Sequence, residues 1–238
     1  MSENEVNLVF FLKPDAVIRR YIGARVLKIL KKKLPHIRFL TFKEFEPSRE
    51  FLADYHYVEH KGKFFFNWLL NYTTSAPIIL TIINGKEDDV KKIREILGPT
   101  MVQKALEKDP LSIRGRFGIY GGINVAHASD AISTAQREFN IWKEYLEREL
   151  NLKIDEGRAE KNAELIDVYI ETYIDYPIID NERYRELCEI VLADPNQKDK
   201  IKQKIVSLLK KETNEKLFKS KSLEVFADIM IGNLFLRK

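Results

Sequence analysis

Apolar and polar positions in the first part of the chain follow two spacings, one typical of strands and one typical of helices. Largely apolar runs at residues 7–12 (NLVFFL) and 77–83 (PIILTII) predict buried strands, and the alternating stretch at 37–46 (IRFLTFKEFE) predicts another. The run RFGIY at residues 116–120 predicts a fourth strand. Apolar residues that recur every three to four positions predict helices. The predicted helices span residues 18–33, 49–58, 61–72, 87–97 and 132–150.

The junction between the first strand and the first helix carries two turn signals. Pro14 keeps Lys13 out of the helical conformation, and Asp15 follows as the expected N-cap of the helix. The elements then follow in the order strand, helix, strand, two helices, strand, helix, strand and helix. This order is consistent with an α+β fold, a ferredoxin-like α/β sandwich in which helices pack on a four-stranded antiparallel sheet.

The strand pattern ends near Leu150, and four amphipathic helices are expected beyond it. Each must bury its apolar face against the others, against the N-terminal part or against a partner. We therefore predict two domains, an α/β domain at residues 1–150 and a small all-α domain at residues 151–238. The four apolar faces are carried by Ile166, Ile170, Tyr173 and Ile174; by Tyr184, Leu187, Cys188 and Val191; by Ile201, Ile205, Leu208 and Leu209; and by Val225, Phe226, Ile229, Met230 and Phe235.

The composition narrows the class of protein. Of 238 residues, 45% are hydrophobic and 32% are charged, which is typical of a globular protein with a substantial core. No apolar run reaches the roughly 18 residues of a membrane-spanning helix, and residues 1–7 lack the basic and apolar regions of a signal peptide. The single cysteine, Cys188, cannot form an internal disulfide and falls among apolar positions. We therefore expect a buried structural thiol in a cytoplasmic protein.

The net charge of +4 suits a ligand that bears phosphate and does not require nucleic acid as a partner. Lysines gather between Lys198 and Lys221, but no aromatic residues alternate with most of them. A solvated helix face is therefore the preferred interpretation of this tract, with RNA binding as the alternative.

The sequence lacks the common fingerprints of nucleotide and metal sites. It contains no G-x-x-x-x-G-K-[ST] loop, no G-x-G-x-x-G loop, no H-E-x-x-H motif and no cysteine cluster. Side chains and a histidine must therefore handle any phosphate. The segment NVAHASD at residues 124–130 places His127 in a predicted polar turn, where a side chain reaches solvent. Taken alone, such a histidine is more often solvated or a helix cap than catalytic.

Several segments together resemble the nucleoside diphosphate kinase family, in both order and spacing, over about residues 6–142. The resemblance implies a ping-pong reaction, in which a nucleoside triphosphate, typically ATP, phosphorylates a histidine and a second nucleoside diphosphate accepts the group. It also implies Mg²⁺ as cofactor, held mainly by the nucleotide phosphates without a protein cage, and a homo-oligomer built from dimers, with a hexamer as one form. The segments are FLKPDAV at 11–17, HYV at 56–58, FF at 64–65, IRG at 113–115 and NVAHASD at 124–130.

Five side chains have catalytic roles in what the resemblance implies. His127 is the nucleophile, because a neutral imidazole is nucleophilic near pH 7. Glu138 accepts a hydrogen bond from one ring nitrogen and leaves the other free to attack, and Ser129 supports the same site. Lys13 stabilises charge on the transferring group, and Tyr57 lines the site near His127.

The resemblance also implies the contacts of the nucleotide. Two guanidinium groups, of Arg94 and Arg114, grip phosphate oxygens bidentately. The base stacks on Phe65, with Leu69 on the same helix face. Outside the resemblance, the charged residues would be read as solvated surface charges and part of the aromatic cluster around Phe65 as core. The implied nucleotide-binding residues are Lys13, Phe65, Leu69, Arg94, Thr100, Arg114 and Asn124.

Three features depart from the family pattern. Ala128 stands where the family usually has glycine after the nucleophile, which costs about 1 kcal/mol if its φ is positive and nothing if φ is negative. The loop from Gly98 to Arg114 is longer than usual, and residues 151–238 have no counterpart in the minimal enzyme. Two alternatives therefore stay open: a nucleotide-binding regulatory protein of the same fold with weak turnover, and a helical interaction or RNA-binding protein.

Overall fold

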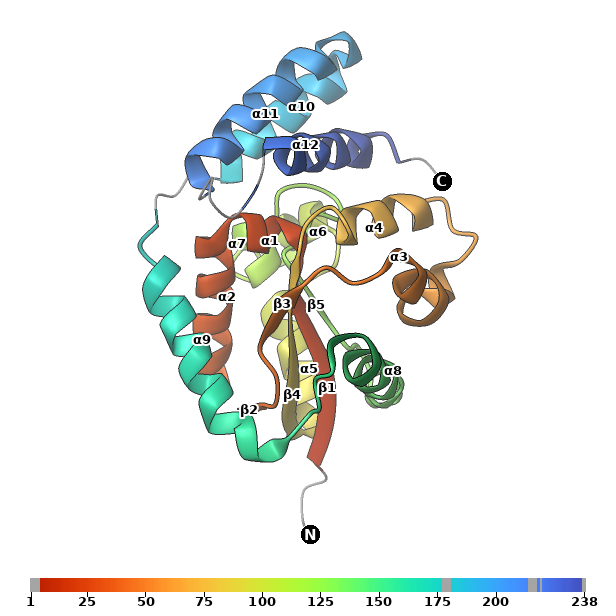
Figure 1. The fold of residues 1–238 in the computed structure, drawn as a ribbon. Coiled ribbons are helices and arrows are strands. Elements are labelled where there is room, and N and C mark those ends of the chain that lie inside the picture. Colours follow the sequence, from red (N-terminus) through yellow and green to blue (C-terminus); the bar gives the residue numbers. More distant parts are fainter. Residues whose placement is uncertain (1–4, 177–180, 214–217, 219, 237–238) are drawn as a thin grey trace.

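The fold is built around a sheet with the strand order β2–β4–β1–β5 (Figure 1). β1 (Glu5–Leu12) and β4 (Ile78–Lys86) are antiparallel, pair along their whole lengths and are buried at almost every position, as their apolar runs predict. β5 (Ala126–Ala128) pairs antiparallel with the other edge of β1. The central strands therefore carry the core of this part of the molecule.

The strand predicted at residues 37–46 is present as two short pieces, β2 (Arg38–Phe39) and β3 (Lys43–Phe45), which both pair with β4. Thr41 lies between them, and its hydroxyl replaces a backbone acceptor for the N–H of Ile82 at 2.9 Å. Taking β2 and β3 as one interrupted strand, the predicted four-stranded antiparallel sheet with packed helices is confirmed.

The structure is a computed structural model that describes residues 5–176, 181–213, 218 and 220–236. The predicted helices at 87–97 and 132–150 are confirmed with the predicted bounds, whereas the others are shorter or interrupted. Between α3 and α4, residues Leu52–His56 form a π-helical turn and Val58–His60 a 3₁₀ turn. The helices up to residue 150 are α1 (Pro14–Ile18), α2 (Arg20–Lys33), α3 (Arg49–Phe51), α4 (Phe66–Thr73), α5 (Glu87–Leu97), α6 (Val102–Lys108), α7 (Ile113–Phe117) and α8 (Ile132–Leu150).

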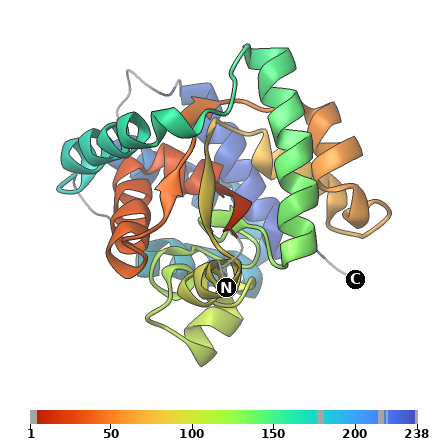
Figure 2. The ribbon, with the colours of Figure 1, turned by 90° about the horizontal axis from the view of Figure 1, so that it is seen from below.

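Helices α2 and α8 lie on opposite sides of the sheet (Figure 2). On one side, the ring of Phe11 in β1 packs against Trp142 of α8, with centroids 6.0 Å apart. On the other side, a Cβ on Gly23 of α2 would lie 2.9 Å from the side chain of Leu12. Glycine at this position therefore lets α2 approach the sheet more closely than any other residue would.

The start of the first helix differs from the prediction. Lys13 is the N-cap and Pro14 the first helical residue, so the prediction that Asp15 caps the helix is wrong. The carboxylate of Asp15 is buried and accepts hydrogen bonds from the hydroxyl of Tyr72 at 2.6 Å and from the backbone N–H of Val125 at 3.0 Å. Its partners are distant in sequence, which is why local turn signals did not reveal its role.

The strand predicted at residues 116–120 is also wrong. Helix α7 occupies the start of this segment, because Ser112 caps it by accepting from the N–H of Gly115 at 3.2 Å. The fourth strand is β5 instead. The apolar character of residues 116–120 reflects burial of Phe117 and Ile119, which a helix and a loop achieve here as well as a strand would.

All four C-terminal helices are confirmed, and they occupy two separate places (Figure 1). α9 lies along α2 and beside β2, where the side-chain N–H₂ of Asn162 donates to the backbone oxygen of Phe39 at 3.1 Å. The other three helices gather at the opposite end of the sheet, over α1 and α4. The division of the chain at residue 150 stays a prediction. The bounds are α9 (Ala159–Tyr173), α10 (Asn181–Ala193), α11 (Lys198–Glu212) and α12 (Ser220–Leu234).

A buried ion pair joins the helices α10 and α11 to the start of α2. Nε of Arg19 lies 3.2 Å from a carboxylate oxygen of Glu212, and both side chains are almost fully buried. The guanidinium also donates to Tyr21 and Asn181. Removing one member of such a pair leaves an uncompensated buried charge. The C-terminal helices are therefore held on the sheet domain in one defined arrangement.

The structure can be compared with the expectations for the cysteine, for membrane-spanning helices and for the lysine tract. Cys188 of α10 is buried as predicted, and burial raises the pKa of its thiol to about 12. Among the described residues, no helix is both long and apolar enough to cross a membrane. In the tract from 198 to 221, Lys202 pairs with Asp228 at 2.7 Å, while residues 214–217 and 219, like the N-terminal residues 1–4, lie outside the described residues.

Candidate active site

A cavity of about 700 Å³ lies between α4, β5, α8 and the end of α12. Of the eleven residues that sequence analysis placed in the site, ten line it. The eleventh, Ser129, lies behind the cavity wall and donates to Glu138 at 2.7 Å. The ten lining residues are Lys13, Tyr57, Phe65, Leu69, Arg94, Thr100, Arg114, Asn124, His127 and Glu138.

His127 is the central residue of β5, not part of a polar turn as predicted. It pairs in register with Phe11 of β1, and its ring stacks on the Phe11 ring with centroids 4.8 Å apart and an angle of 16°. Its side chain is 18% exposed. The strand fixes the backbone of His127 and the phenyl ring fixes its imidazole, while one side of the imidazole stays open to the cavity.

The backbone just before His127 is strained. Val125 has a φ of 77°, and the N–H of Ala126 donates to the carbonyl oxygen of Asn124 at 2.9 Å, which closes a γ-turn. A β-branched residue rarely adopts this conformation. It is held by Asp15, which accepts from the N–H of Val125, and by the N–H of Lys13, which donates to the Val125 carbonyl at 2.8 Å. This turn directs the short strand β5 into the cavity wall.

Ala128 carries no conformational penalty. Among the described residues, only Val125 and Asn151 have a positive φ without being glycine. Alanine is therefore compatible with the backbone at position 128, and the cost of about 1 kcal/mol expected for a positive φ does not arise. Its carbonyl oxygen instead accepts from Arg94 at 3.3 Å.

Glu138 of α8 orients the imidazole. One of its carboxylate oxygens lies 2.9 Å from Nε2 of His127 and 2.7 Å from the hydroxyl of Ser129. Burial alone would raise the pKa of Glu138, but the neighbouring His127 and its hydrogen bond outweigh burial and lower the pKa to about 2. A carboxylate only accepts hydrogen bonds, so Nε2 carries the proton and Nδ1 keeps its lone pair.

His56 is a buried neighbour of this pair that sequence analysis quoted within a motif but gave no role. Its ring lies 4.7 Å from that of His127, and its Nδ1 accepts from the indole of Trp142 at 3.2 Å. Burial lowers the pKa of His56 to about 3, so it is neutral. The adjacent Tyr57 is buried and hydrogen-bonded to Thr73, and burial raises the pKa of its hydroxyl. A signal was available: the histidine of the HYV segment falls in a mostly apolar helical pattern.

Three donor atoms of His56, His127 and Glu138 lie within 4.8 Å of one another, as in a metal site. One ring nitrogen of each histidine, Nε2 of His127 and Nδ1 of His56, has a hydrogen-bond partner. Two imidazoles with one carboxylate also suit a transition metal and not Mg²⁺, which prefers oxygen ligands. The cluster is therefore accounted for as the hydrogen-bonded support of His127.

Lys13, Arg94 and Arg114 line the same cavity, together with Arg137 of α8. Arg114 is buried and donates to the carbonyl oxygens of Gly98 and Ala126 at 2.8 and 3.0 Å. Burial, and then the charge of Arg94, lower the pKa of Arg114 to about 9. Such mutual destabilisation of positive charges is relieved by an anion, so this end of the cavity is built to bind one with several charges.

The pKa of Lys13, like that of Arg114, is lowered by burial and by a neighbouring positive charge. Its ammonium donates to the side-chain oxygen of Asn124 at 2.8 Å, while the amide of Asn124 donates to the Thr100 carbonyl at 2.7 Å. Burial, and then the charge of Arg114, lower the pKa of Lys13 to about 7. At pH 7 the site thus holds a lysine that is only partly charged until an anion arrives.

We expect the binding of tripolyphosphate at pH 8 to take up close to one proton per chain through Lys13. With a pKa of about 7, the amine is roughly nine-tenths neutral at pH 8, and a bound anion favours the ammonium form and raises its pKa. Calorimetry in two buffers that differ in ionisation enthalpy measures the proton uptake.

The matched comparison uses two lysine variants. Lys13→Met keeps the three arginines that line the cavity, whereas Lys28→Met removes an exposed lysine of α2. The uptake should be lost in the first variant and kept in the second. Equal uptake by the unmodified chain and by Lys13→Met would contradict the prediction.

The opposite end of the cavity is apolar and aromatic. Phe65 precedes the first residue of α4, and Leu69 follows one turn later, with Phe64, Trp68 and Met101 beside them. Aromatic rings in such a position stack on a planar ligand group. The cavity therefore combines a cationic end, which carries the imidazole, with an aromatic end.

Comparison with known proteins identifies the family to which the chain is similar. A sequence model of the family described as nucleoside diphosphate kinase matches residues 7–147, which include every predicted site residue. A nucleoside diphosphate kinase of Chloroflexus aurantiacus is 40% identical over 134 residues, which are 56% of this chain and 84% of that protein. One of Staphylococcus aureus is 40% identical over 131 residues, 55% of this chain and 83% of that protein.

Solved structures give the same result. A nucleoside diphosphate kinase of Aquifex aeolicus superposes with a TM-score of 0.53 at 31% identity, covering 58% of this chain and 95% of that one. A halophilic nucleoside diphosphate kinase of Halobacterium salinarum in complex with CDP superposes with a TM-score of 0.52 at 29% identity, covering 58% of this chain and 88% of that one. More than a third of the chain thus lies outside each comparison.

Proposed function

The chain belongs to the nucleoside diphosphate kinase family, and we propose on that basis that it moves the terminal phosphoryl group of a nucleoside triphosphate, typically ATP, to a nucleoside diphosphate through phospho-His127. One observation carries the proposal: the imidazole of His127, clamped by Glu138, lies in the same cavity as Lys13, Arg94 and Arg114. Phosphoryl transfer depends mainly on such positioning and on charge stabilisation.

In the first half of the reaction, Nδ1 of His127 attacks the terminal phosphorus of the triphosphate. An N–P bond forms, the bond from phosphorus to the bridging oxygen breaks, and the nucleoside diphosphate leaves with that electron pair. Nε2 keeps its proton, so the phosphorylated ring is positively charged and the carboxylate of Glu138 stabilises it. In the second half, a terminal oxygen of another nucleoside diphosphate attacks phosphorus, and Nδ1 recovers its lone pair.

Lys13, Arg94 and Arg114 stabilise the negative charge on the transferring group in both directions. Asn124 supports this role because its side-chain oxygen accepts a hydrogen bond from Lys13. Its amide nitrogen donates to the backbone oxygen of Thr100, which also lines the cavity. These polar contacts position the phosphates and discriminate little between nucleosides.

The nucleoside part of the substrate lies at the aromatic end of the cavity. We assign the contact with the base to Phe65 and Leu69, and the support of the catalytic group to Tyr57 and Ser129. Every base presents an aromatic face, so stacking accepts all of them and broad use of nucleotides is expected.

Mg²⁺ is the proposed cofactor, and the cavity offers residues that fit it. The carboxylates of Glu59 and Asp130 are exposed and line the cavity, whereas that of Glu138 is engaged by His127 and Ser129. When bound, the ion would neutralise part of the negative charge of the phosphates. Glu59 and Asp130 would hold it from the protein side. The homo-oligomer and the cytoplasmic location expected from sequence stay predictions.

The test is direct detection of the phosphorylated enzyme. The full chain is incubated briefly with ATP labelled in its terminal phosphate and with Mg²⁺, and the label is mapped by peptide. We expect one label on His127 that is stable in alkali, lost in acid and removed within seconds by added GDP.

Two results would count against the proposal. Label on a residue other than His127 would contradict the mechanism. Tight nucleotide binding without any label would favour a regulatory protein of the same fold over an enzyme. Omitting Mg²⁺ with added chelator is the matched control, and it should suppress the labelling.

A further inference from the structure

The end of the last helix reaches the cavity. Asn233 and Leu234 of α12, together with Leu236 just beyond it, are among the lining residues. The match to the family ends at residue 147, so these three side chains come from a part of the chain that the family comparison does not cover. Helix α12 thus adds a wall to a site that is otherwise made by the matched region.

This wall is anchored at two points. The indole N–H of Trp68 in α4 donates to the backbone oxygen of Ile229 at 3.0 Å. The buried Asn233 donates to the carbonyl oxygen of Tyr120 at 3.1 Å and accepts from the N–H of Gly122 at 3.3 Å. Side-chain and backbone groups are therefore both used to hold α12 on the rim of the cavity.

The turn that binds the side chain of Asn233 contains two glycines, Gly121 and Gly122. Gly121 has a φ of 53°, and a Cβ at this position would lie 2.5 Å from the amide nitrogen of Asn233. A Cβ on Gly122 would lie 2.9 Å from the ring of Trp68. Two glycines in sequence thus allow α4, the turn and α12 to meet closely. The end of α12 therefore packs closely against the turn at Gly121 and Gly122.

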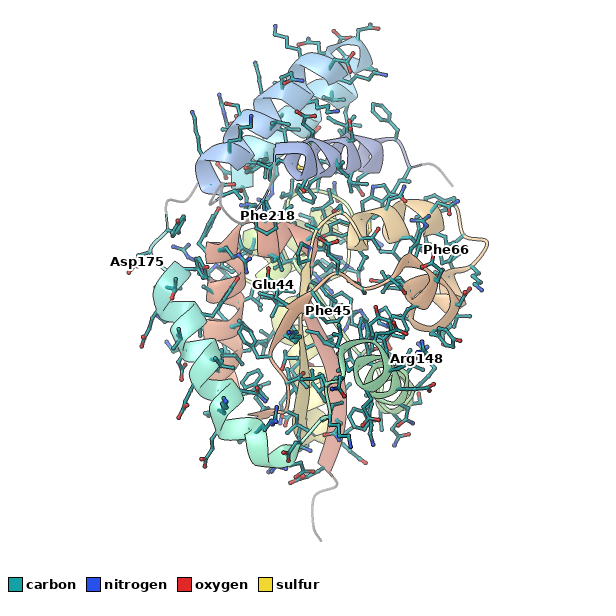
Figure 3. All side chains as sticks on the ribbon, viewed as in Figure 1. Glu44, Phe45, Phe66, Arg148, Asp175 and Phe218 are labelled. Atoms are coloured by element: carbon teal, nitrogen blue, oxygen red, sulfur yellow. The ribbon has the colours of Figure 1, made fainter. Side chains whose placement is uncertain are left out.

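The wall stands at the aromatic end of the cavity. α12 runs alongside α4, and the start of α4, marked by Phe66, lies on the same side of the molecule as the end of α12 (Figure 3). Phe65 directly precedes that start. Leu234 and Leu236 therefore line the same cavity as Phe65 and Leu69, and Trp68 of α4 holds the helix that leads to them.

We infer that α12 forms part of the nucleoside subsite, with Leu234 and Leu236 covering the base that stacks on Phe65. The inference rests on the proposed function insofar as a nucleotide occupies the cavity with its phosphates toward His127. Two leucine side chains cannot read the hydrogen-bonding edge of a base. They bury its apolar surface, so the expected effect is tighter binding of nucleotides of every base.

The test compares a ligand that has a base with one that lacks it. In the variant Leu234→Ala/Leu236→Ala, the Kd of ADP should rise about tenfold, as expected for the loss of several buried methyl groups. The Kd of tripolyphosphate, which contacts only the cationic end, should change less than about twofold. Calorimetry on the full chain measures both constants, and neither measurement depends on turnover.

Phe235→Ala is the matched control, because Phe235 lies between the two leucines, is 38% exposed and does not line the cavity. It should leave both constants unchanged. An unchanged Kd for ADP in the double variant would overturn the inference. So would an equal loss for tripolyphosphate, or an equal loss in Phe235→Ala, since either would indicate a general disturbance of α12.

The outcome is separable from that of the proposed function. If the unmodified chain forms no phosphohistidine but binds ADP in a manner that depends on Leu234 and Leu236, the proposed reaction fails and the subsite stands. If the phosphohistidine forms and the double variant binds ADP normally, the reaction stands and the subsite fails.

Discussion

Replacing His127 with alanine should lower the rate of phosphoryl exchange between ATP and GDP by about 10⁶-fold, the scale seen when the nucleophile of a covalent mechanism is removed. In the proposed mechanism, Nδ1 of His127 forms the bond to phosphorus, and the remaining cations only position the substrates. The binding of ADP should persist, because Lys13, Arg94 and Arg114 are untouched. A coupled assay measures the exchange rate and calorimetry measures the binding.

His36→Ala is the control for this variant. His36 is hydrogen-bonded to Asp89 at 2.7 Å and does not line the cavity, so exchange should stay within about twofold of the unmodified rate. The assignment of the nucleophile is wrong if His127→Ala keeps a tenth or more of the exchange rate.

Replacing Glu138 with glutamine should lower the exchange rate by roughly 10⁴-fold, in line with the loss when a histidine loses its orienting carboxylate. The carboxylate can only accept, which keeps the proton on Nε2 of His127. An amide can also donate, and the ring can then hold its proton on Nδ1, where no lone pair remains for attack. Because the pKa of Glu138 is about 2, the carboxylate form is present throughout the usual pH range.

Glu138 is a positioning residue in this account, so its variant should separate binding from chemistry. The KM for nucleotides should stay nearly constant while kcat falls, and the yield of phosphohistidine in a brief incubation should fall with kcat. Glu144→Gln on the same helix, at a side chain that is 77% exposed, is the matched control and should leave both parameters unchanged. A rise in KM with unchanged kcat would argue for a contact with substrate instead.

The fold could be predicted from sequence where an apolar pattern reports burial along a whole element. The strands β1 and β4 and the helices α5 and α8 are of this kind, and their bounds follow the pattern closely. Short elements could not be predicted, because distant side chains determine them. Helix α7, which Ser112 caps, occupies the start of an expected strand. Its residue Arg114 donates to the carbonyls of Gly98 and Ala126, and no local pattern contains those partners.

The site could be predicted only through resemblance, and then residue by residue. Motifs reveal that a histidine, a lysine and two arginines occur at suitable positions, and the structure brings them into one cavity. Motifs do not contain the strained turn at Val125 or the support from His56. They also could not reveal Asn233, because it belongs to a segment outside the family match and acts through the turn at Gly121 and Gly122.

The position of α9 has a consequence for self-association. An uncovered strand at the border of a sheet can add a strand from another molecule. Here the side-chain amide of Asn162 donates a hydrogen bond to the backbone oxygen of Phe39, and α9 covers β2 from within the same chain. Two copies cannot merge their sheets through β2 while α9 stays in place. A homo-oligomer that keeps α9 in this position would therefore form through another surface.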